Sequence, residues 1–408
     1  MHIGVPEVRR LASDVEYAVP YSLGRGGRSS GAEGARARDP LLWYRVPADY
    51  ESMVSPRADA ALVALLIPAM VAGGALHVQG PVTDELVFHL QHGYQDVLRA
   101  VIPSLRSVEV VAPQQQPAGP RQSGVAAGFS AGVDSFGVLA DHFYDPAVPP
   151  ALKITHLLFH RLGSHDDAGA AEGALFLDRF QRAARVADKI GLPFIPVDSN
   201  LTEAFRGTGF NYQETHTPRS ASVPFLLQQG VGRWLYASAM HLRHTRVAPF
   251  FDTTLTDPVA LPMLSTSALV LESDGGRYTR FEKTMRVAEI PDSYWSLDVC
   301  VTGGWGSNCS KCFKCLRTMA GLEIGGKLDR YRDVFDLDVY RQHRDTYLAL
   351  TPLSRDPVVK ELAVEAKRRG FPLPRPSLRR DSPFVLRHVK NEVRRHGARL
   401  LQRRGSPP

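Results

Sequence analysis

Apolar and polar residues alternate along the chain in blocks whose lengths are typical of strands and helices. In the N-terminal part the pattern predicts a compact α/β unit with a helix at residues 58–72, a strand at 75–79, a helix at 82–101 and a strand at 106–112. The longest uncharged apolar run, Ala60 to Leu76, is short for a membrane span and contains Pro68 and a Gly-Gly pair. It therefore predicts a buried helix followed by a turn into a strand.

The pattern becomes more regular after residue 124. The predicted strands lie at residues 125–129, 153–160, 194–198 and 246–251. The predicted helices lie at residues 134–143, 172–190 and 222–241. Strands that alternate with helices favour an α/β fold with a doubly wound parallel sheet and helices on both of its faces. Ligands of such sheets bind at the carboxyl ends of the strands.

Two stretches rich in small and polar residues interrupt these blocks. The stretch SLGRGGRSSGAEGARARDP, residues 22–40, predicts a mobile loop. The stretch APQQQPAGPRQSG, residues 112–124, predicts a linker with a domain boundary near residue 120. We therefore expect an N-terminal α/β accessory domain at residues 1–120, a main domain at 121–325 and a helical, basic C-terminal extension at 326–408.

Composition and charge fit a globular protein whose basic residues are concentrated in the tail. Apolar residues make up 44% of the chain and charged residues 22%. No secretory signal and no transmembrane segment is expected, which favours a cytoplasmic protein. The net charge is +7, and residues 367–404 hold thirteen lysines and arginines against two acids. This basic tail predicts an amphipathic helix that binds RNA, an anionic surface or an acidic partner, or that only keeps the chain soluble.

The stretch GFSAGVDSFG, residues 128–137, joins the first strand of the main domain to its helix. Small residues allow backbone N–H groups at Ala131, Gly132 and Val133 to approach a phosphate closely. The hydroxyls of Ser130 and Ser135 can bind phosphate oxygens, and Asp134 can hold Mg²⁺. The lysine of the common γ-phosphate loop is absent. The alternative interpretation is a capped helix that follows a tight turn.

All four cysteines of the chain lie within sixteen residues, at Cys300, Cys309, Cys312 and Cys315. The C-x8-C-x2-C-x2-C spacing lets four thiolates face one centre, and four sulfurs in a tetrahedron suit Zn²⁺. Such a site has no open position, so the zinc would be structural. An iron–sulfur cluster and four unliganded thiols are the alternatives.

The two motifs together resemble a known enzyme family over residues 121–325. S-A-G-V-D-S at 130–135 resembles the S-G-G-x-D-S signature of the PP-loop ATP pyrophosphatases. Combined with the cysteine spacing, it is similar to the 7-cyano-7-deazaguanine synthases. The resemblance implies an adenine nucleotide alpha hydrolase-like (HUP) fold that binds ATP, Mg²⁺ and Zn²⁺. It also implies a ligase that adenylates a carboxylate on a small molecule or peptide, after which ammonia or an amine displaces AMP to give an amide or a nitrile.

The resemblance also suggests individual site residues. Arg219, in T-P-R-S, and Lys283, in F-E-K-T, match segments that supply active-site residues in the family, and Phe159 and His160 stand where related enzymes bind adenine. Ala131 replaces the first glycine of the signature, so either this position is not left-handed or the loop is reshaped. A PP-loop enzyme that modifies RNA by thiolation and a nucleotide-binding protein that has lost catalysis remain as alternatives.

Overall fold

The chain divides into two compact units, residues 1–298 and 299–408. The computed structural model describes residues 1–22, 40–164, 172–301 and 308–375. The predicted mobile loop and the predicted basic tail helix thus lie outside the described residues, apart from the ends of the loop. The predicted boundary near residue 120 lies inside the first unit, and the predicted boundary at 325 lies inside the second.

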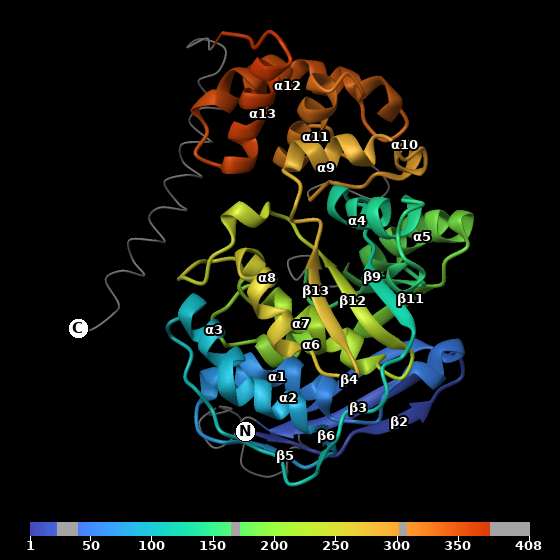
Figure 1. The fold of residues 1–408 in the computed structure, drawn as a ribbon, viewed down its shortest axis with the longest axis vertical. Helices are drawn as coiled ribbons and strands as arrows, with labels where there is room; N and C mark the ends of the chain where they lie inside the picture. Colours follow the sequence, from blue (N-terminus) through green and yellow to red (C-terminus); the bar gives the residue numbers. More distant parts are fainter. Residues whose placement is uncertain (23–39, 165–171, 302–307, 376–408) are drawn as a thin grey trace, which may run out of the picture. The chain divides into compact units, whose positions relative to one another are not determined.

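The first unit is built on a large, mostly parallel sheet (Figure 1). Its parallel core consists of β9 (Gly124–Gly128), β10 (His156–His160), β11 (Phe194–Ser199), β12 (Val231–Ala237) and β13 (Val270–Asp274), in the spatial order β13-β12-β9-β10-β11. From β9 the chain proceeds through β10 to β11 on one side, and then continues with β12 and β13 on the other. The order therefore reverses between β9 and β12, which is where ligands of open α/β sheets bind.

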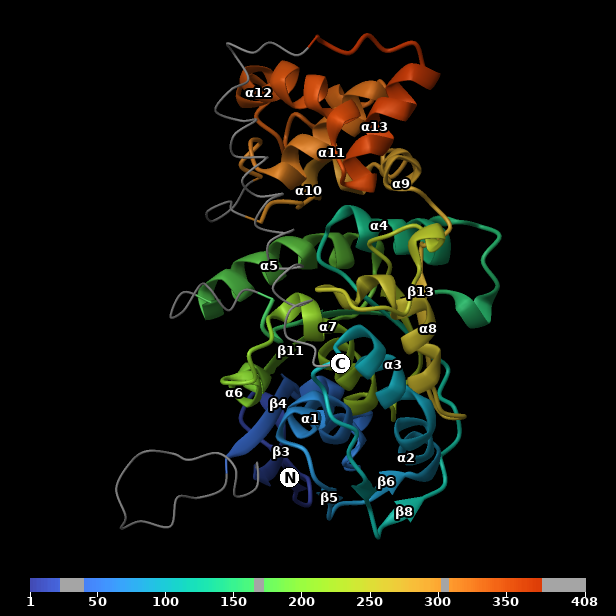
Figure 2. The ribbon, with the colours of Figure 1, turned by 90° about the vertical axis from the view of Figure 1, so that its left-hand side faces the viewer.

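Helices cover both faces of this sheet. They include α4 (Val133–Leu139, continued to Tyr144 by a π-helical turn), α5 (Glu172–Ile190), α6 (Leu201–Phe205), α7 (Tyr212–Leu226), α8 (Asp257–Ala260), α9 (Arg280–Val287) and α10 (Asp292–Ser296). On β12, Tyr236 faces α7, because its hydroxyl contacts His216 of that helix. Its neighbour Leu235 points to the opposite face, since side chains alternate along a strand. Helix α5 packs against β11 and helix α7 against β12 (Figure 2).

The N-terminal region extends the same sheet rather than forming a separate domain. β4 (Leu41–Pro47) pairs antiparallel with β11, and the sheet continues through β3 (Asp14–Ser22), β1 (His2–Ile3), β5 (Leu76–Val78) and β7 (Val110–Val111), with β2 (Glu7–Arg10) paired to β3. The Ser199 hydroxyl donates to the Trp43 carbonyl at 2.7 Å. The segment predicted as a linker is also anchored, because β8 (Gln115–Gln116) pairs with β6 (Val82–Thr83).

The apolar run near residue 60 forms α1 (Asp59–Ala72), which is buried on nearly all sides and packs against α7. A helix that is apolar all round needs such surroundings. Among the residues that the structure describes, no helix is long and apolar enough to cross a membrane. The predicted helix at 82–101 is present as α2 (Asp84–His89), a π-helical turn and α3 (Gln95–Val101), with a kink at Gly93.

Two predicted elements are wrong. The helix expected at residues 222–241 is instead the end of α7, a turn and the whole of β12. A side chain at Gly232 would lie 1.9 Å from the Gln122 carbonyl oxygen, so the backbones approach too closely there for any residue but glycine. The strand expected at 246–251 is irregular, and Pro249 lacks the N–H that a strand ladder needs.

The described part of the second unit is helical. It contains α11 (Phe313–Ile324), α12 (Leu337–Leu350) and α13 (Pro357–Arg368), and α11 packs against both other helices. Asp336 and Asp356 cap α12 and α13 through their side chains. The four cysteines stand at the start of α11 and in the segment before it.

Candidate functional site

The turn after β9 is held by its own hydrogen bonds. The backbone N–H of Ser130 donates to the Ser135 hydroxyl at 3.3 Å, and that hydroxyl donates to the Gly132 carbonyl at 3.1 Å. Gly132 has extended backbone and precedes α4, whose first residue is Val133. Ser130 is exposed and Ser135 is buried. Ser135 therefore fixes the shape of the turn, while Ser130 remains accessible at its surface.

Ala131 adopts the left-handed backbone conformation, with φ at 56°. The sequence left open whether this position is left-handed, and the structure answers that it is. Left-handed backbone costs a residue with a side chain roughly 1–2 kcal/mol. The carbonyl of Ala131 accepts the backbone N–H of Asp298 at 2.9 Å, which helps to hold this conformation.

Asp134 joins two basic side chains of α9. Its carboxylate accepts both terminal nitrogens of Arg280 at 2.9 Å, and the Nζ of Lys283 lies 3.0 Å from its Oδ1 atom. Side-chain exposure is 3% for Lys283, 9% for Arg280 and 29% for Asp134. α9 begins with a capping box between Thr279 and Glu282, which fixes the helix start just before Arg280. Two buried positive charges thus converge on the first turn of α4.

This cluster shifts the ionisation of its members. Burial alone would raise the pKa of Asp134, but the charges of Arg280 and Lys283 outweigh it and hold that pKa well below its usual range. Burial lowers the pKa of Lys283, and Asp134 opposes that shift. Asp134 is therefore charged at neutral pH where it meets Arg280 and Lys283, and Asp274 also acts on Lys283.

The cluster lies at the carboxyl ends of β12 and β13. Lys283 donates through Nζ to the carbonyl of Ser238, and Arg280 donates to the carbonyl of Ala239 at 2.9 Å; both residues directly follow β12. A side chain at Gly137 of α4 would lie 3.0 Å from Cγ of Lys283, so the lysine stem packs on this glycine. The turn after β9 and the basic residues of α9 therefore meet where the strand order reverses.

Phe159 and His160 end β10 beside an aromatic cluster. The ring of Phe159 lies 5.1 Å from Phe176 of α5 and 5.9 Å from Phe194 of β11, and Phe194 in turn contacts Phe129 just before the turn. Burial lowers the pKa of His160 to about 4, so this imidazole is neutral at physiological pH. Phe159 is half-buried and packs mainly on its neighbours.

Arg219 lies on α7 and is 1% exposed. Its guanidinium donates to the carbonyl of Leu162 at 3.1 Å and stacks 3.6 Å from the Phe205 ring centroid. These contacts bring it to the carboxyl end of β10, on the helix that packs beside Tyr236. The structure thus brings Lys283 directly to Asp134, whereas the contacts of Arg219 that we describe connect α7 with β10 and α6.

The four cysteines form a candidate metal centre in the second unit. Their sulfur atoms lie within 4.8 Å of one another, with 3.9 Å between Cys300 and Cys312 and 3.5 Å between Cys312 and Cys315. Zn–S bonds of about 2.3 Å place tetrahedral sulfurs a little under 4 Å apart, so the cluster fits Zn²⁺. The pairing of Cys312 with Cys315 lowers the pKa of Cys312, which favours the thiolate that binds metal.

The backbone around the cysteines is folded toward their sulfurs. The N–H of Cys312 donates to the sulfur of Cys309 at 3.2 Å, and the N–H of Cys309 donates to that of Cys300 at 3.5 Å. Ser310, between the first two cysteines of the triplet, has φ at 55°, a left-handed turn that directs the chain around the centre. Four protein ligands leave no open position, which indicates a structural site.

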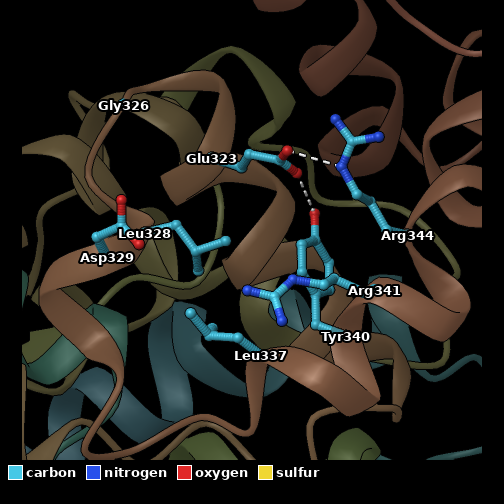
Figure 3. A pocket seen from close by; sticks show the side chains of 8 residues that line it. All are labelled: Glu323, Gly326, Leu328, Asp329, Leu337, Tyr340, Arg341 and Arg344. Carbon is cyan, nitrogen blue, oxygen red and sulfur yellow. Dashed lines mark hydrogen bonds and ion pairs between the residues drawn. The ribbon is translucent and has the colours of Figure 1, made fainter.

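A separate hollow of about 320 Å³ lies between α11 and α12 of the second unit (Figure 3). Glu323 accepts the hydroxyl of Tyr340 at 2.8 Å and the Nε of Arg344 at 2.7 Å. Its charge is therefore neutralised within the helix pair. We interpret this network as part of the packing of α11 on α12.

Sequence reasoning missed Arg280 and Ser238, which contact Asp134 and Lys283 respectively. A usable signal for Arg280 was its spacing, since residues three apart share one face of a helix and Lys283 was already a candidate. Comparisons with protein-family models, with curated proteins and with solved structures find no match to this chain. The resemblance to the PP-loop ATP pyrophosphatases thus rests on the sequence motifs alone.

Proposed function

We propose that this chain is an ATP-dependent carbon–nitrogen ligase of the PP-loop type, with a HUP-like nucleotide core. The observation that carries the proposal is the convergence of Arg280 and Lys283 on Asp134, at the turn after β9 where the strand order reverses. Two buried basic side chains beside a turn of small residues favour the binding of a polyphosphate.

The proposed reaction has two steps. An oxygen of the substrate carboxylate attacks the α-phosphorus of ATP, the bond to the β-phosphate oxygen breaks, and pyrophosphate leaves. Ammonia or an amine then attacks the carbonyl carbon, and AMP leaves from that carbon. Arg280 and Lys283 offset the charge of the pyrophosphate, and Ser130 and the backbone amides of residues 131–135 bind its oxygens. Asp134 would hold Mg²⁺, and that ion would neutralise the charge of the phosphates further.

Two observations favour this function over its alternatives. Ala131 keeps the left-handed backbone, so the alanine in place of glycine does not remove the shape of the turn. This weakens the case for a degenerate nucleotide-binding protein. All four cysteines belong to one cluster, so none is left to carry sulfur in a thiolation reaction.

The experiment is a pyrophosphate-release screen with ATP, Mg²⁺, ammonium chloride and a panel of carboxylic acids that includes deazapurine carboxylates and short peptides. We expect at least one acid to stimulate release of pyrophosphate and AMP in equal amounts. K283M should abolish this release. Release that K283M leaves unchanged would show that the site lies elsewhere, and K327M, in the helical second unit, is the matched control.

A further inference from the structure

A second buried polar cluster lies beside β12, on the face of the sheet that α7 covers. His216 of α7 contacts the hydroxyl of Tyr236 through Nδ1 at 2.8 Å and a carboxylate oxygen of Asp252 through Nε2 at 3.2 Å. The exposed fraction of the side chain is 9% for His216 and 31% for Asp252. The three residues thus form a continuous series of hydrogen bonds from a half-buried tyrosine to a partly exposed carboxylate.

The chemistry of the partners fixes the direction of these bonds. A carboxylate only accepts hydrogen bonds, so Nε2 of His216 carries a proton and donates to Asp252. When the imidazole is neutral, Nδ1 is therefore the acceptor and the Tyr236 hydroxyl donates to it. Asp252 is itself held in place by the backbone N–H of Thr254 at 2.9 Å. This arrangement orients the imidazole so that it can take a proton from Tyr236.

Several other ionisable groups face the hydrogen-bonded series Tyr236–His216–Asp252. Asp257 of α8 accepts the Thr217 hydroxyl and is buried, and Tyr212 and Arg219 approach from α7 itself. Burial alone would lower the pKa of His216, but Asp252 and Asp257 outweigh it and raise that pKa despite the opposing charge of Arg219. Burial raises the pKa of Asp257 to about 6. Two acids thus surround one imidazole and stabilise its protonated form.

The hydrogen-bonded series Tyr236–His216–Asp252 lies near the proposed site. Tyr236 lies two residues before Ser238, whose carbonyl accepts the Nζ of Lys283. Tyr236 approaches the end of β12 from the α7 face, whereas Lys283 packs against α4. The two groups of residues therefore both lie near the carboxyl end of β12.

We propose that Tyr236, His216 and Asp252 form a proton relay that serves the nitrogen-transfer step of the reaction. The inference rests on the proposed function. As the C–N bond forms and the bond to AMP breaks, the nitrogen gives one proton to the Tyr236 oxygen while the Tyr236 proton passes to Nδ1 of His216. Asp252 stabilises the resulting imidazolium, which then loses its extra proton to solvent and returns to the neutral form. Tyr236 is the group next to the reacting nitrogen, and His216 and Asp252 act through it.

Two nucleophiles separate this step from adenylation. Hydroxylamine is a strong nucleophile that is largely unprotonated at neutral pH, and it captures an acyl-adenylate as a hydroxamate with little help from a base. Ammonia needs its proton removed as it adds. The experiment measures the ratio of amide to hydroxamate with the carboxylic acid that stimulates pyrophosphate release most strongly, ATP and Mg²⁺, in the full-length protein.

We expect Y236F to lower this ratio by about 100-fold. Y44F is the matched control, because Tyr44 also loses a buried hydrogen bond of 2.8 Å to α7, in this case to Ser222, and lies outside the relay. The ratio in Y44F should equal that of the wild type. A ratio that Y236F leaves unchanged while hydroxamate still forms would overturn the relay and leave the proposed function standing. If the wild type forms no hydroxamate from any acid of the panel, both the relay and the proposed function are contradicted.

The pH dependence of the amide-to-hydroxamate ratio gives a second test. A purely structural role of these residues would leave this pH dependence unchanged. In the wild type the ratio, divided by the concentration of free ammonia, should rise as pH increases through the pKa of His216, because only the neutral imidazole accepts a proton. D252N removes a group that raises this pKa, so the rise should move to lower pH, and NMR titration of the His216 imidazole should move with it. An unchanged titration in a folded D252N variant would contradict the relay.

Discussion

The Nζ atom of Lys283 lies 3.0 Å from the Oδ1 atom of Asp134, although 149 positions separate the two residues in the chain. The contact joins the first turn of α4 to the first turn of α9. Because Arg280 binds the same carboxylate, Asp134 organises two cations that would otherwise repel each other in a buried setting. Its removal should therefore cost more than the loss of either cation.

We expect D134N to lower the free energy of unfolding by about 2 kcal/mol, less than is usual for fully buried pairs because part of the Asp134 side chain is exposed. K283M should cost less, since Arg280 still pairs with Asp134. Urea denaturation measures both. D338N is the control for D134N, because Asp338 is 83% exposed and its pair with Arg341 should contribute under about 0.5 kcal/mol. Equal effects of D134N and D338N would contradict the organising role of Asp134.

The carboxylate of Asp134 should make the stability of the fold depend on pH. The pKa of Asp134 is lower in the folded chain than in the unfolded chain. Its ion pairs therefore stabilise the fold above the unfolded pKa of about 4, and this contribution disappears as pH falls further. Between pH 6 and 3 we expect Tm, measured by circular dichroism, to fall more steeply for the wild type than for D134N. Parallel slopes for the two proteins would show that Asp134 is not charged and paired as described.

The contact between Gly137 and the side chain of Lys283 offers a variant, G137A, that should change activity without changing stability. Alanine is favoured over glycine inside a helix by about 1 kcal/mol. The added methyl group of G137A would, however, lie 3.0 Å from Cγ and 3.1 Å from Cδ of Lys283, so the lysine must shift. We expect pyrophosphate release to drop by about tenfold or more while Tm changes little. A fully active G137A variant would mean that the position of Lys283 does not matter for the reaction.

The cysteine centre predicts a zinc content that can be measured directly. We expect about one zinc ion per chain by mass spectrometry of the metal, and a colourless protein. C315S should reduce the zinc content and the stability of the helical second unit, since Cys315 belongs to the first turn of α11. K311A retains all four ligands and changes an exposed side chain, so it is the control. Iron with visible absorbance would replace the zinc interpretation with a cluster.

The parts of the fold that sequence could predict are those with a local signal. Residues 172–190 have helical apolar spacing, and α5 has these bounds. β12 was mistaken for helix because Trp234, Leu235 and Ala237 follow an apolar helix without an alternating pattern, as is usual for a strand buried on both faces. The pair Gly230 and Gly232 was the available sign of a break. The strands β1 to β4, which lie before residue 48, were not predicted at all.

The residues of the candidate site likewise fall into those that the sequence could predict and those that only the fold brings together. The turn at 130–135 and the four cysteines could be found because their residues are close in sequence, and their short spacing has a chemical meaning. Lys283 was found through resemblance, and its approach to Asp134 depends on contacts that no spacing reveals. The relay residues Tyr236, His216 and Asp252 come from three separate elements, so only the folded chain brings them together.

The junction between β4 and β11 has a consequence for how the chain can be shortened. Parallel strands at the border of a sheet leave unpaired N–H and C=O groups that recruit other chains. Here Tyr44 and Arg45 cover Ser199 and Asp198 in antiparallel register. A fragment that began at residue 121 would contain every residue of the candidate nucleotide site and yet present β11 uncovered. The N-terminal region thus covers an edge of β11 that would otherwise be open to pairing with a second copy of the chain.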